Sequence, residues 1–185
     1  MRIITGSAKG CNLKTPKGMS TRPTSDRVKE SLFSILGSDA CGRVLDIFAG
    51  TGGLGLEALS RGADSCTFID KATTEIIADN AKHTRLADKC QILKGDVFAQ
   101  LRRLETAGQQ FDLVFCDPPY HQGLAHRALE QLENSQLLAP DAIVIMEYGG
   151  DEPELPATTS LQLVKKQQYG KITQINFYHL PVEEG

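Results

Sequence analysis

The chain has 185 residues, of which 41% are hydrophobic and 23% charged, and its formal net charge is −3. These values are typical of one globular domain with a sizeable core, and they exclude a low-complexity or fibrous protein. No apolar run approaches the roughly 20 residues that span a bilayer, and the opening residues MRIITGSAKG lack a signal-peptide core. We therefore expect a cytoplasmic protein with no membrane partner.

Cysteine and histidine usage gives no sign of a disulfide framework or a metal site. The five cysteines form no C-x-x-C pair, and the four histidines are scattered. Buried free thiols in a reducing compartment and no bound metal are the expected outcome.

The charge is unevenly distributed along the chain. Residues 1–30 hold seven basic side chains against two acidic ones, a net charge of +5, so the remaining 155 residues carry −8. A basic arm on an acidic body is typical of a nucleic-acid-binding protein. A solvated, lysine-rich surface is the alternative interpretation.

The elements in chain order begin with short β-type runs in residues 1–18, broken by glycines, which predict a small hairpin-like extension. A helix should follow in RPTSDRVKESLFSIL, with Thr24 or Ser25 as its cap and Gly37 at its end. Strands and helices then alternate. Strands are predicted at residues 43–49, 65–70, 90–96, 111–117 and 142–148, with helices at 54–61, 73–87, 97–106 and 124–134.

The apolar runs of these strands are short and do not strictly alternate, as expected where helices cover both faces of a parallel sheet. Residues 161–180 instead contain two β runs that meet at Tyr169-Gly170-Lys171, which predicts a C-terminal hairpin. We expect an N-terminal extension over residues 1–20 that contacts RNA, and one α/β domain over residues 21–185.

The stretch from Gly50 to Gly55, GTGGLG, fits the G-x-G-x-x-G pattern between a strand and a helix. No Lys-Ser/Thr pair follows it, which excludes a P-loop. Asp46 ends the preceding strand, where a carboxylate would repel a dinucleotide pyrophosphate but would suit an ammonium group. S-adenosyl-L-methionine brings such a group and has no phosphate, so it is favoured over NAD.

Two further carboxylates end the next predicted strands. Asp70 could accept both ribose hydroxyls, although NAD has the same ribose. Asp96 could accept from the adenine amino group, or it could simply cap the following helix. Ligands bind across the carboxyl edge of such sheets, so these residues predict one site.

Asp117-Pro118-Pro119-Tyr120 closes the fourth strand. Consecutive prolines stiffen the backbone and cannot pair further in a sheet, so the Asp117 carboxylate and the Pro118 carbonyl are held as two acceptors. An exocyclic NH2 of a nucleobase offers two donors, and Tyr120 could stack on the base. An ordinary strand-ending turn is the alternative.

With these residues in place, the chain resembles the class I S-adenosylmethionine-dependent amino-methyltransferases. It is most similar to the RsmD family of 16S ribosomal RNA guanine-N2 methyltransferases. The blocks that carry the resemblance are RPTSDRVKESLFSIL, LDIFAGTGGLGLEALSRGA, FIDKATTEIIADNAKHTRL and FDLVFCDPPY.

The resemblance implies a Rossmann-like α/β fold with a seven-stranded, mostly parallel sheet, helices on both faces, and a hairpin that makes one strand antiparallel. It also implies methyl transfer to the exocyclic N2 of a guanine in 16S ribosomal RNA, free or in a small-subunit particle, by a monomer. The predicted catalytic residues are Asp117, Pro118, Pro119 and Tyr120. The predicted cofactor-binding residues are Thr24, Asp46, Phe48, Gly50, Thr51, Gly52, Asp70, Lys71, Asp96 and Val97. The predicted substrate-binding residues are Arg2, Lys9, Lys14, Arg22 and Arg27.

The residues alone do not choose the base, because adenine N6, cytosine N4 and guanine N2 are all amino groups. An amino-methyltransferase acting on another base or on DNA stays open, as does a non-catalytic RNA-binding assembly factor. The small size of the chain favours RNA, because an exposed loop base is cheaper to unstack than a paired one.

Overall fold

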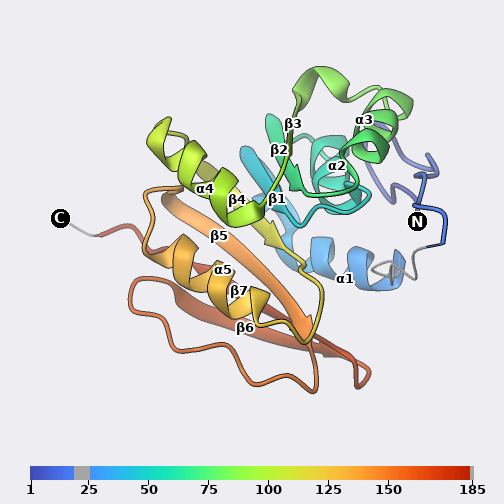
Figure 1. The fold of residues 1–185 in the computed structure, drawn as a ribbon. Helices are drawn as coiled ribbons and strands as arrows, with labels where there is room; N and C mark the ends of the chain where they lie inside the picture. Colours follow the sequence, from blue (N-terminus) through green and yellow to red (C-terminus); the bar gives the residue numbers. More distant parts are fainter. Residues whose placement is uncertain (19–25, 184–185) are drawn as a thin grey trace.

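The computed structural model describes residues 1–18 and 26–183, with a seven-stranded sheet at its centre (Figure 1). The strands are β1 (Arg43–Ile47), β2 (Ser65–Asp70), β3 (Cys90–Lys94), β4 (Phe111–Cys116), β5 (Leu138–Gly149), β6 (Gln162–Tyr169) and β7 (Thr173–His179). Their order is β3-β2-β1-β4-β5-β7-β6. The first five strands run parallel, and β7 pairs antiparallel with both β5 and β6. The predicted fold is confirmed, including its antiparallel C-terminal hairpin.

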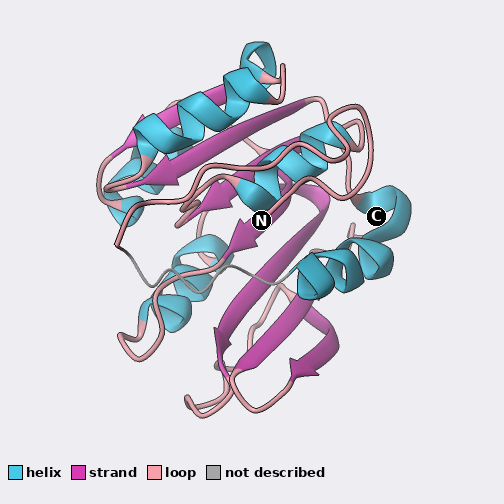
Figure 2. Cartoon of the chain, turned by 90° about the vertical axis from the view of Figure 1, so that its right-hand side faces the viewer, coloured by secondary structure: helices cyan, strands magenta, loops and turns pink. Residues whose placement is uncertain are grey.

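Helices cover the sheet on both faces (Figure 2). They are α1 (Asp26–Leu36), α2 (Gly53–Ser60), α3 (Thr74–His83), α4 (Val97–Thr106) and α5 (Leu124–Glu133), with short 3-10 turns at Gly37–Asp39 and Ala87–Lys89. Side chains that alternate along β1 feed two separate cores: Val44 packs with α1, α2 and α3, whereas Leu45 and Ile47 pack with α4 and α5. The continuous apolar runs of the sequence follow from this double burial.

Two predicted boundaries are wrong by four residues, more than any other. The helix predicted for residues 73–87 ends at His83, because Arg85 takes a left-handed φ of 59° and the chain turns there. The fifth strand starts at Leu138 rather than at residue 142. A register shift opposite β4 and a φ of 70° at Asp141 let this strand continue through a Pro-Asp pair that resembles a turn.

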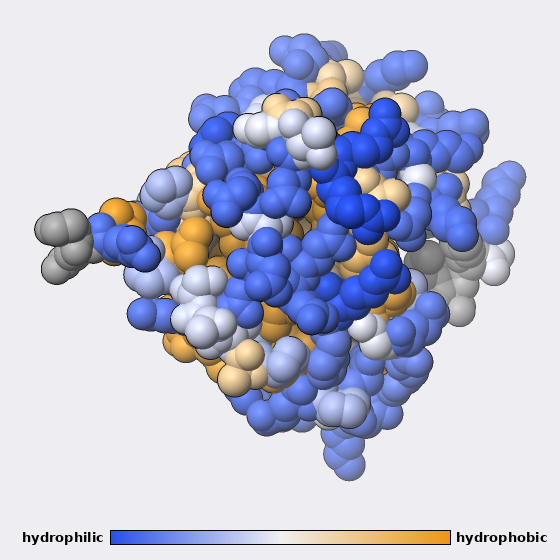
Figure 3. Space-filling view, turned by 60° about the vertical axis from the view of Figure 1, so that its left-hand side comes forward, coloured by the Kyte–Doolittle hydropathy of each residue, from blue (hydrophilic) through white to orange (hydrophobic). Residues whose placement is uncertain are grey.

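The surface is largely polar where it is shown, and the cysteines differ in exposure. The face in Figure 3 is mainly hydrophilic with scattered apolar atoms. All five cysteines are free, as expected, and burial raises the pKa of Cys66 and Cys116 well above its usual range. Cys41, in contrast, is exposed. None of the helices in residues 1–18 and 26–183 is long and apolar enough to cross a membrane.

Residues 1–18, the N-terminal arm, follow a hairpin path that is closed by one isolated bridge between Arg2 and Asn12 rather than by a ladder. Ile3, Ala8 and Leu13 of the arm are buried in the same core as α1, α2 and α3. The arm lies beside α2 and α3 in Figure 1. Its separation from the main domain at residue 20 stays a prediction, because residues 19–25 lie outside the described ranges.

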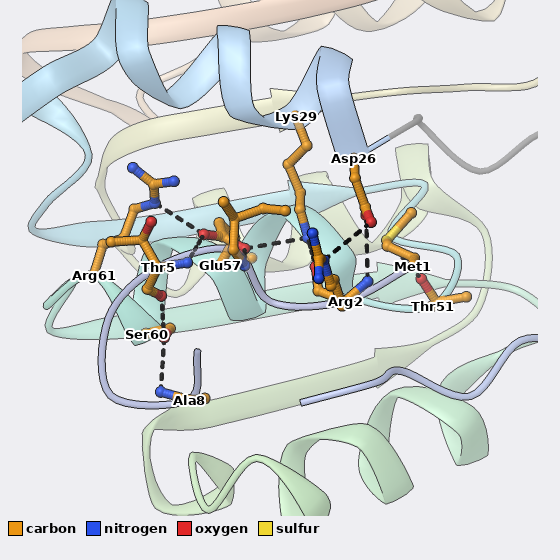
Figure 4. A network of polar contacts seen from close by, with 12 residues as sticks. Met1, Arg2, Thr5, Ala8, Asp26, Lys29, Thr51, Glu57, Ser60 and Arg61 are labelled. Carbon is orange, nitrogen blue, oxygen red and sulfur yellow. Dashed lines mark hydrogen bonds and ion pairs between the residues drawn. The ribbon is translucent and has the colours of Figure 1, made fainter. Parts of the chain in front are cut away.

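A buried ion pair fixes α1 and the arm to α2 (Figure 4). The side chains of Lys29 and Glu57 are both fully buried, and Lys29 Nζ lies 3.1 Å from Glu57 Oε2. Lys29 also donates a hydrogen bond to the carbonyl of Arg2. Burial lowers the pKa of Lys29, and the carboxylate of Glu57 opposes that shift. Although Lys29 counts toward the basic charge of residues 1–30, it contributes nothing to an exposed surface.

The Glu57 carboxylate is also satisfied from the arm. Its two oxygens accept the backbone N–H groups of Ile4 at 2.9 Å and Thr5 at 3.0 Å, and Arg61 donates to it at 2.9 Å. A buried charge is stable only with such a full set of partners.

Replacing Lys29 by Met should lower the free energy of unfolding by about 3 kcal/mol, because Met keeps the apolar volume but leaves the Glu57 charge buried without its counterion. Urea denaturation would measure the change. The matched control is Lys14→Ala, which removes an exposed pair with Asp79 and should cost less than about 1 kcal/mol. Equal losses in the two variants would show that the buried pair is not a main support of the fold.

Candidate active site

The site is built at the point where the sheet changes direction. β2 lies on one side of β1 and β4 on the other, so the connections from β1 and β4 leave in opposite directions. A crevice forms at the carboxyl edge of such a switch point, and ligands of α/β sheets bind there. Ile47 pairs with Cys116, which brings the loop after β1 directly beside the loop after β4.

The glycine loop, residues 50–55, turns from β1 into α2. Gly50 has a φ of 59° and Gly52 a φ of 80°, both left-handed. A Cβ at Gly52 would lie 3.3 Å from Ile77, whereas a Cβ at Gly50 would meet no atom within 4 Å. The backbone at Gly50 therefore faces open space, where a ligand can approach it closely.

Two of the predicted carboxylates hold the ends of the glycine loop. Asp46 Oδ2 accepts from Gly55 N at 2.9 Å, and Asp70 Oδ2 accepts from Gly50 N at 3.0 Å. Asp70 Oδ1 also accepts the N–H groups of Ala72 and Thr73. Each carboxylate oxygen can take more than one hydrogen bond, so these contacts leave capacity for a ligand.

Asp46 lies in an unusual electrostatic environment. Its side chain is 2% exposed. Burial raises its pKa to about 8; the Gly55 N–H acts in the opposite direction, and the nearby Asp70 charge adds to the rise. Without a cationic partner, Asp46 is therefore mainly protonated at neutral pH.

The backbone of Phe48 is strained. Its φ is 56°, rare for a bulky side chain, and its ring packs edge-on against Phe98 with centroids 6.1 Å apart. Strain of this kind is concentrated at functional sites. The residue lies directly after β1, at the carboxyl edge of the sheet.

Asp96 caps α4, because its Oδ2 accepts from Ala99 N at 2.9 Å. The structure thus shows the helix-capping role of Asp96, while a contact of Asp96 with adenine stays a prediction. Val97 is buried behind it, and Lys71 is exposed after β2. Thr24, also predicted to bind the cofactor, lies outside the described residues.

The loop after β4 is fixed by side chains of β5 and β7. Asp117 and Tyr120 are half-buried, Pro118 is buried and Pro119 exposed. The Tyr120 hydroxyl donates to Glu147 Oε1 at 2.8 Å and lies 3.3 Å from Thr173 Oγ1. Burial and the Glu147 charge raise the pKa of Tyr120, so the hydroxyl stays a donor.

The far end of this loop is held as well. His121 has a φ of 62°, and its N–H donates to Glu152 Oε1 at 2.9 Å, while Glu152 Oε2 accepts from Gly149 N at 2.6 Å. Neither Glu152 nor Glu147 was singled out from the sequence. Glu147 could have been, because it ends an apolar strand as Asp46 and Asp70 do.

The basic residues of the arm point outward but are not free of partners. Arg2 Nε lies 3.5 Å from Asp26, and Lys14 Nζ lies 3.0 Å from Asp79. Such exposed pairs are weak and can exchange for phosphate. Lys9 and Arg27 are exposed, and Arg22 lies outside the described residues. Across the part of the chain that the structure describes, no cluster of three or more His, Cys, Asp or Glu side chains could hold a metal.

The chain is similar to known proteins along most of its length. Residues 1–179 match the model of a family described as Conserved hypothetical protein 95. "Putative rRNA methyltransferase YlbH" of Bacillus subtilis is 39% identical over 96% of this chain and 98% of its own length. Ribosomal RNA small subunit methyltransferase D of Escherichia coli K12 is 36% identical over 89% of this chain and 84% of its own. The solved structure of a hypothetical protein from Thermus thermophilus superposes with a TM-score of 0.82 at 29% identity, over 96% of this chain and 98% of that one.

The raised pKa of Asp46 predicts a pH dependence of stability. Its folded pKa of about 8 exceeds the unfolded value of about 3.9, so between these limits the folded state holds a proton that the unfolded state has lost. This contribution is complete below about pH 4 and disappears as the pH rises through about 8.

Relative to Asp46→Asn, which keeps an acceptor for Gly55, the wild type should lose about 1 kcal/mol of unfolding free energy per pH unit between pH 5 and 7. Urea denaturation at several pH values would measure this slope. If the unfolding free energies of the two proteins changed in parallel with pH, the raised pKa of Asp46 would be contradicted.

Proposed function

We propose that the chain transfers a methyl group from S-adenosylmethionine to the exocyclic N2 of a guanine in 16S ribosomal RNA. The chain belongs to the RsmD family, which the Conserved hypothetical protein 95 model describes. One observation carries the proposal. The pairing of Ile47 with Cys116 puts a glycine loop suited to the cofactor beside an Asp-Pro-Pro-Tyr loop suited to an amino group. The names of two relatives support ribosomal RNA as the substrate.

The residues at the glycine loop fit S-adenosylmethionine. The open space at Gly50 admits a ligand against the backbone, and the buried Asp46 carboxylate, which is costly to ionise alone, suits the ligand ammonium. Asp70 can accept the ribose hydroxyls with its remaining lone pairs. When bound, the cofactor supplies a methyl group on a sulfonium that a nitrogen nucleophile can attack. The residues proposed to hold it are Thr24, Asp46, Phe48, Gly50, Thr51, Gly52, Asp70, Lys71, Asp96 and Val97.

The Asp117 loop would activate the amino group. The Asp117 carboxylate and the Pro118 carbonyl accept its two hydrogens, which keeps the nitrogen lone pair out of conjugation with the ring. The bound cofactor would supply the methyl group to this nitrogen, and water would take the proton that the nitrogen then loses. Asp117 acts as a hydrogen-bond acceptor that stabilises the developing positive charge rather than as a base, because the reference pKa of Asp is about 3.9.

Tyr120 would stack on the target base. Its hydroxyl is already held by Glu147, so its ring needs little further ordering when a base arrives. Pro119 is exposed between Pro118 and Tyr120 in the sequence, and it would form part of the rim around the target base.

The proposed RNA contacts are basic side chains of the arm and its surroundings: Arg2, Lys9, Lys14, Arg22 and Arg27. Phosphate contacts of this kind position the RNA and do not read its sequence. The choice of guanine rests on the family resemblance. The substrate is ribosomal RNA, free or in a small-subunit particle, and the protein acts as a monomer.

Asp117→Ala should lower the rate of methyl transfer by about 100-fold or more, because no side-chain oxygen is left to accept a hydrogen of the amino group or to stabilise its developing positive charge. The measurement is incorporation of labelled methyl into ribosomal RNA from a strain that lacks the protein. Calorimetry should show unchanged affinity for S-adenosylhomocysteine. His121→Ala, a neighbouring exposed change, is the control, and full activity of Asp117→Ala would refute the mechanism.

The same assay distinguishes the alternatives. Mass spectrometry of nucleosides from the methylated RNA should find N2-methylguanosine. Methyl on adenine or cytosine, or preferential labelling of duplex DNA, would favour another amino-methyltransferase. A protein that does not bind S-adenosylhomocysteine would fit a non-catalytic assembly factor.

Tyr120→Ala should raise KM for RNA by about 5- to 100-fold, since a base–aromatic stack is worth roughly 1–3 kcal/mol. Tyr120→Phe keeps the ring and loses the hydroxyl contacts with Glu147 and Thr173, so its KM should stay within a few-fold of the wild type. Steady-state kinetics with saturating cofactor would separate the two variants. Similar KM values for both would argue against stacking.

A further inference from the structure

Asn80, in the middle of α3, joins two segments that are far apart in the sequence. Its side chain is fully buried. Asn80 Oδ1 accepts from Lys14 N at 2.7 Å, while Nδ2 donates to Lys14 O at 3.1 Å and to Thr51 O at 2.9 Å. Both amide hydrogens and the oxygen are used, which fixes the orientation of the amide.

These contacts do not serve the helix that carries them. Asn is a weak helix former, and Asn80 lies on the buried face of α3, near the apolar Ile77 and Ala81. Its polar groups bond to the arm at Lys14 and to the cofactor loop at Thr51. The side chain is therefore a bridge between the two.

A second contact between the arm and the loop lies at Met1. The Thr51 hydroxyl is 3.8 Å from Met1 Sδ, and a Cβ at Gly53 would lie only 2.2 Å from the same sulfur (Figure 4). Leu13 N donates to the carbonyl of Met1 at 3.0 Å. Met1 thus lies against residues 51–53, and Leu13 is bonded to Met1.

The middle of the arm is docked on α2, the helix that the glycine loop opens. Ala8 N donates to Ser60 Oγ at 2.9 Å, and that hydroxyl donates to the carbonyl of Thr5 at 2.6 Å. A Cβ at Gly6 would lie 1.8 Å from Ser60 O, so the backbones touch. The arm, α2 and the loop form one packed unit.

We propose that Asn80 is a positioning residue that couples the arm to the glycine loop, so that binding of the cofactor and contact of the arm with RNA strengthen each other. Lys14 provides the link, because Asn80 binds its backbone while its ammonium group lies at the surface beside Asp79. Ordering either end orders the other, and the coupling free energy is the same in both directions. The RNA part of this inference rests on the proposed function.

Hydrogen exchange of the arm amides tests the coupling without RNA. In the wild type, saturating S-adenosylhomocysteine should slow exchange at Ile4, Thr5 and Lys14 by about 10-fold, because the ligand stabilises residues 50–53. In Asn80→Ala the ligand should leave these rates unchanged, and its Kd should rise by about 10-fold.

The matched control is Thr84→Val. Thr84 is buried directly after the end of α3, and among the described residues its hydroxyl bonds only to the carbonyls of Asn80 and Ala81 of that helix. This variant should keep the wild-type response even though it also loses a buried polar group. If Asn80→Ala does not fold, Asn80→Ser replaces it, since it retains a small polar side chain but cannot reach both partners.

The outcomes separate this inference from the proposed function. A wild-type protein that binds S-adenosylhomocysteine without any change at the arm overturns the coupling, whatever its activity on RNA. A change at the arm without methylation of ribosomal RNA supports the coupling and overturns the proposed function. With ribosomal RNA present, the wild type should bind S-adenosylhomocysteine about 10-fold more tightly than alone, and Asn80→Ala should bind it equally in both cases; equal tightening in both proteins would count against Asn80.

Discussion

The parallel pairing of β1 with β4 is the constraint on which the candidate site depends. Because Ile47 lies opposite Cys116, the chain leaves both strands at the same height of the carboxyl edge. A slip of one residue would move every side chain of a strand to the other face and separate the two loops. Double burial of these strands in two apolar cores makes such a slip costly. The packing of β1 and β4 in the two cores thus fixes the relative positions of the two loops that carry the chemistry.

Carboxylates at the strand ends share a second task, which is to hold backbone. Asp46 and Asp70 bind N–H groups at the two ends of the glycine loop, and Glu152 does the same for the loop after β4. Each loop is therefore anchored by these hydrogen bonds, which lowers the amount of ordering that ligand binding must still supply. The acidic edge has a cost, visible in the raised pKa of Asp46.

Local patterns sufficed to predict the alternation of strands and helices, the glycine loop and the Asp-Pro-Pro-Tyr loop, because each depends on neighbours in the sequence. Contacts between residues far apart in the sequence were not predicted. Glu57 looks like an ordinary surface residue of an amphipathic helix, yet it is buried against Lys29 and the arm. Asn80 binds residues 29 and 66 positions away. The end of α3 was missed because apolar spacing continues past the left-handed turn at Arg85.

The docking of the arm also bears on the order in which the chain acquires its structure. The arm is synthesised before the side chains that receive its backbone, because Glu57 and Asn80 follow more than 50 residues later. Contacts of such long sequence separation form late, since a large loop must close before they repay its entropy. The arm must therefore wait for the synthesis of α3 before it can dock fully, and the glycine loop gains its last contacts only then.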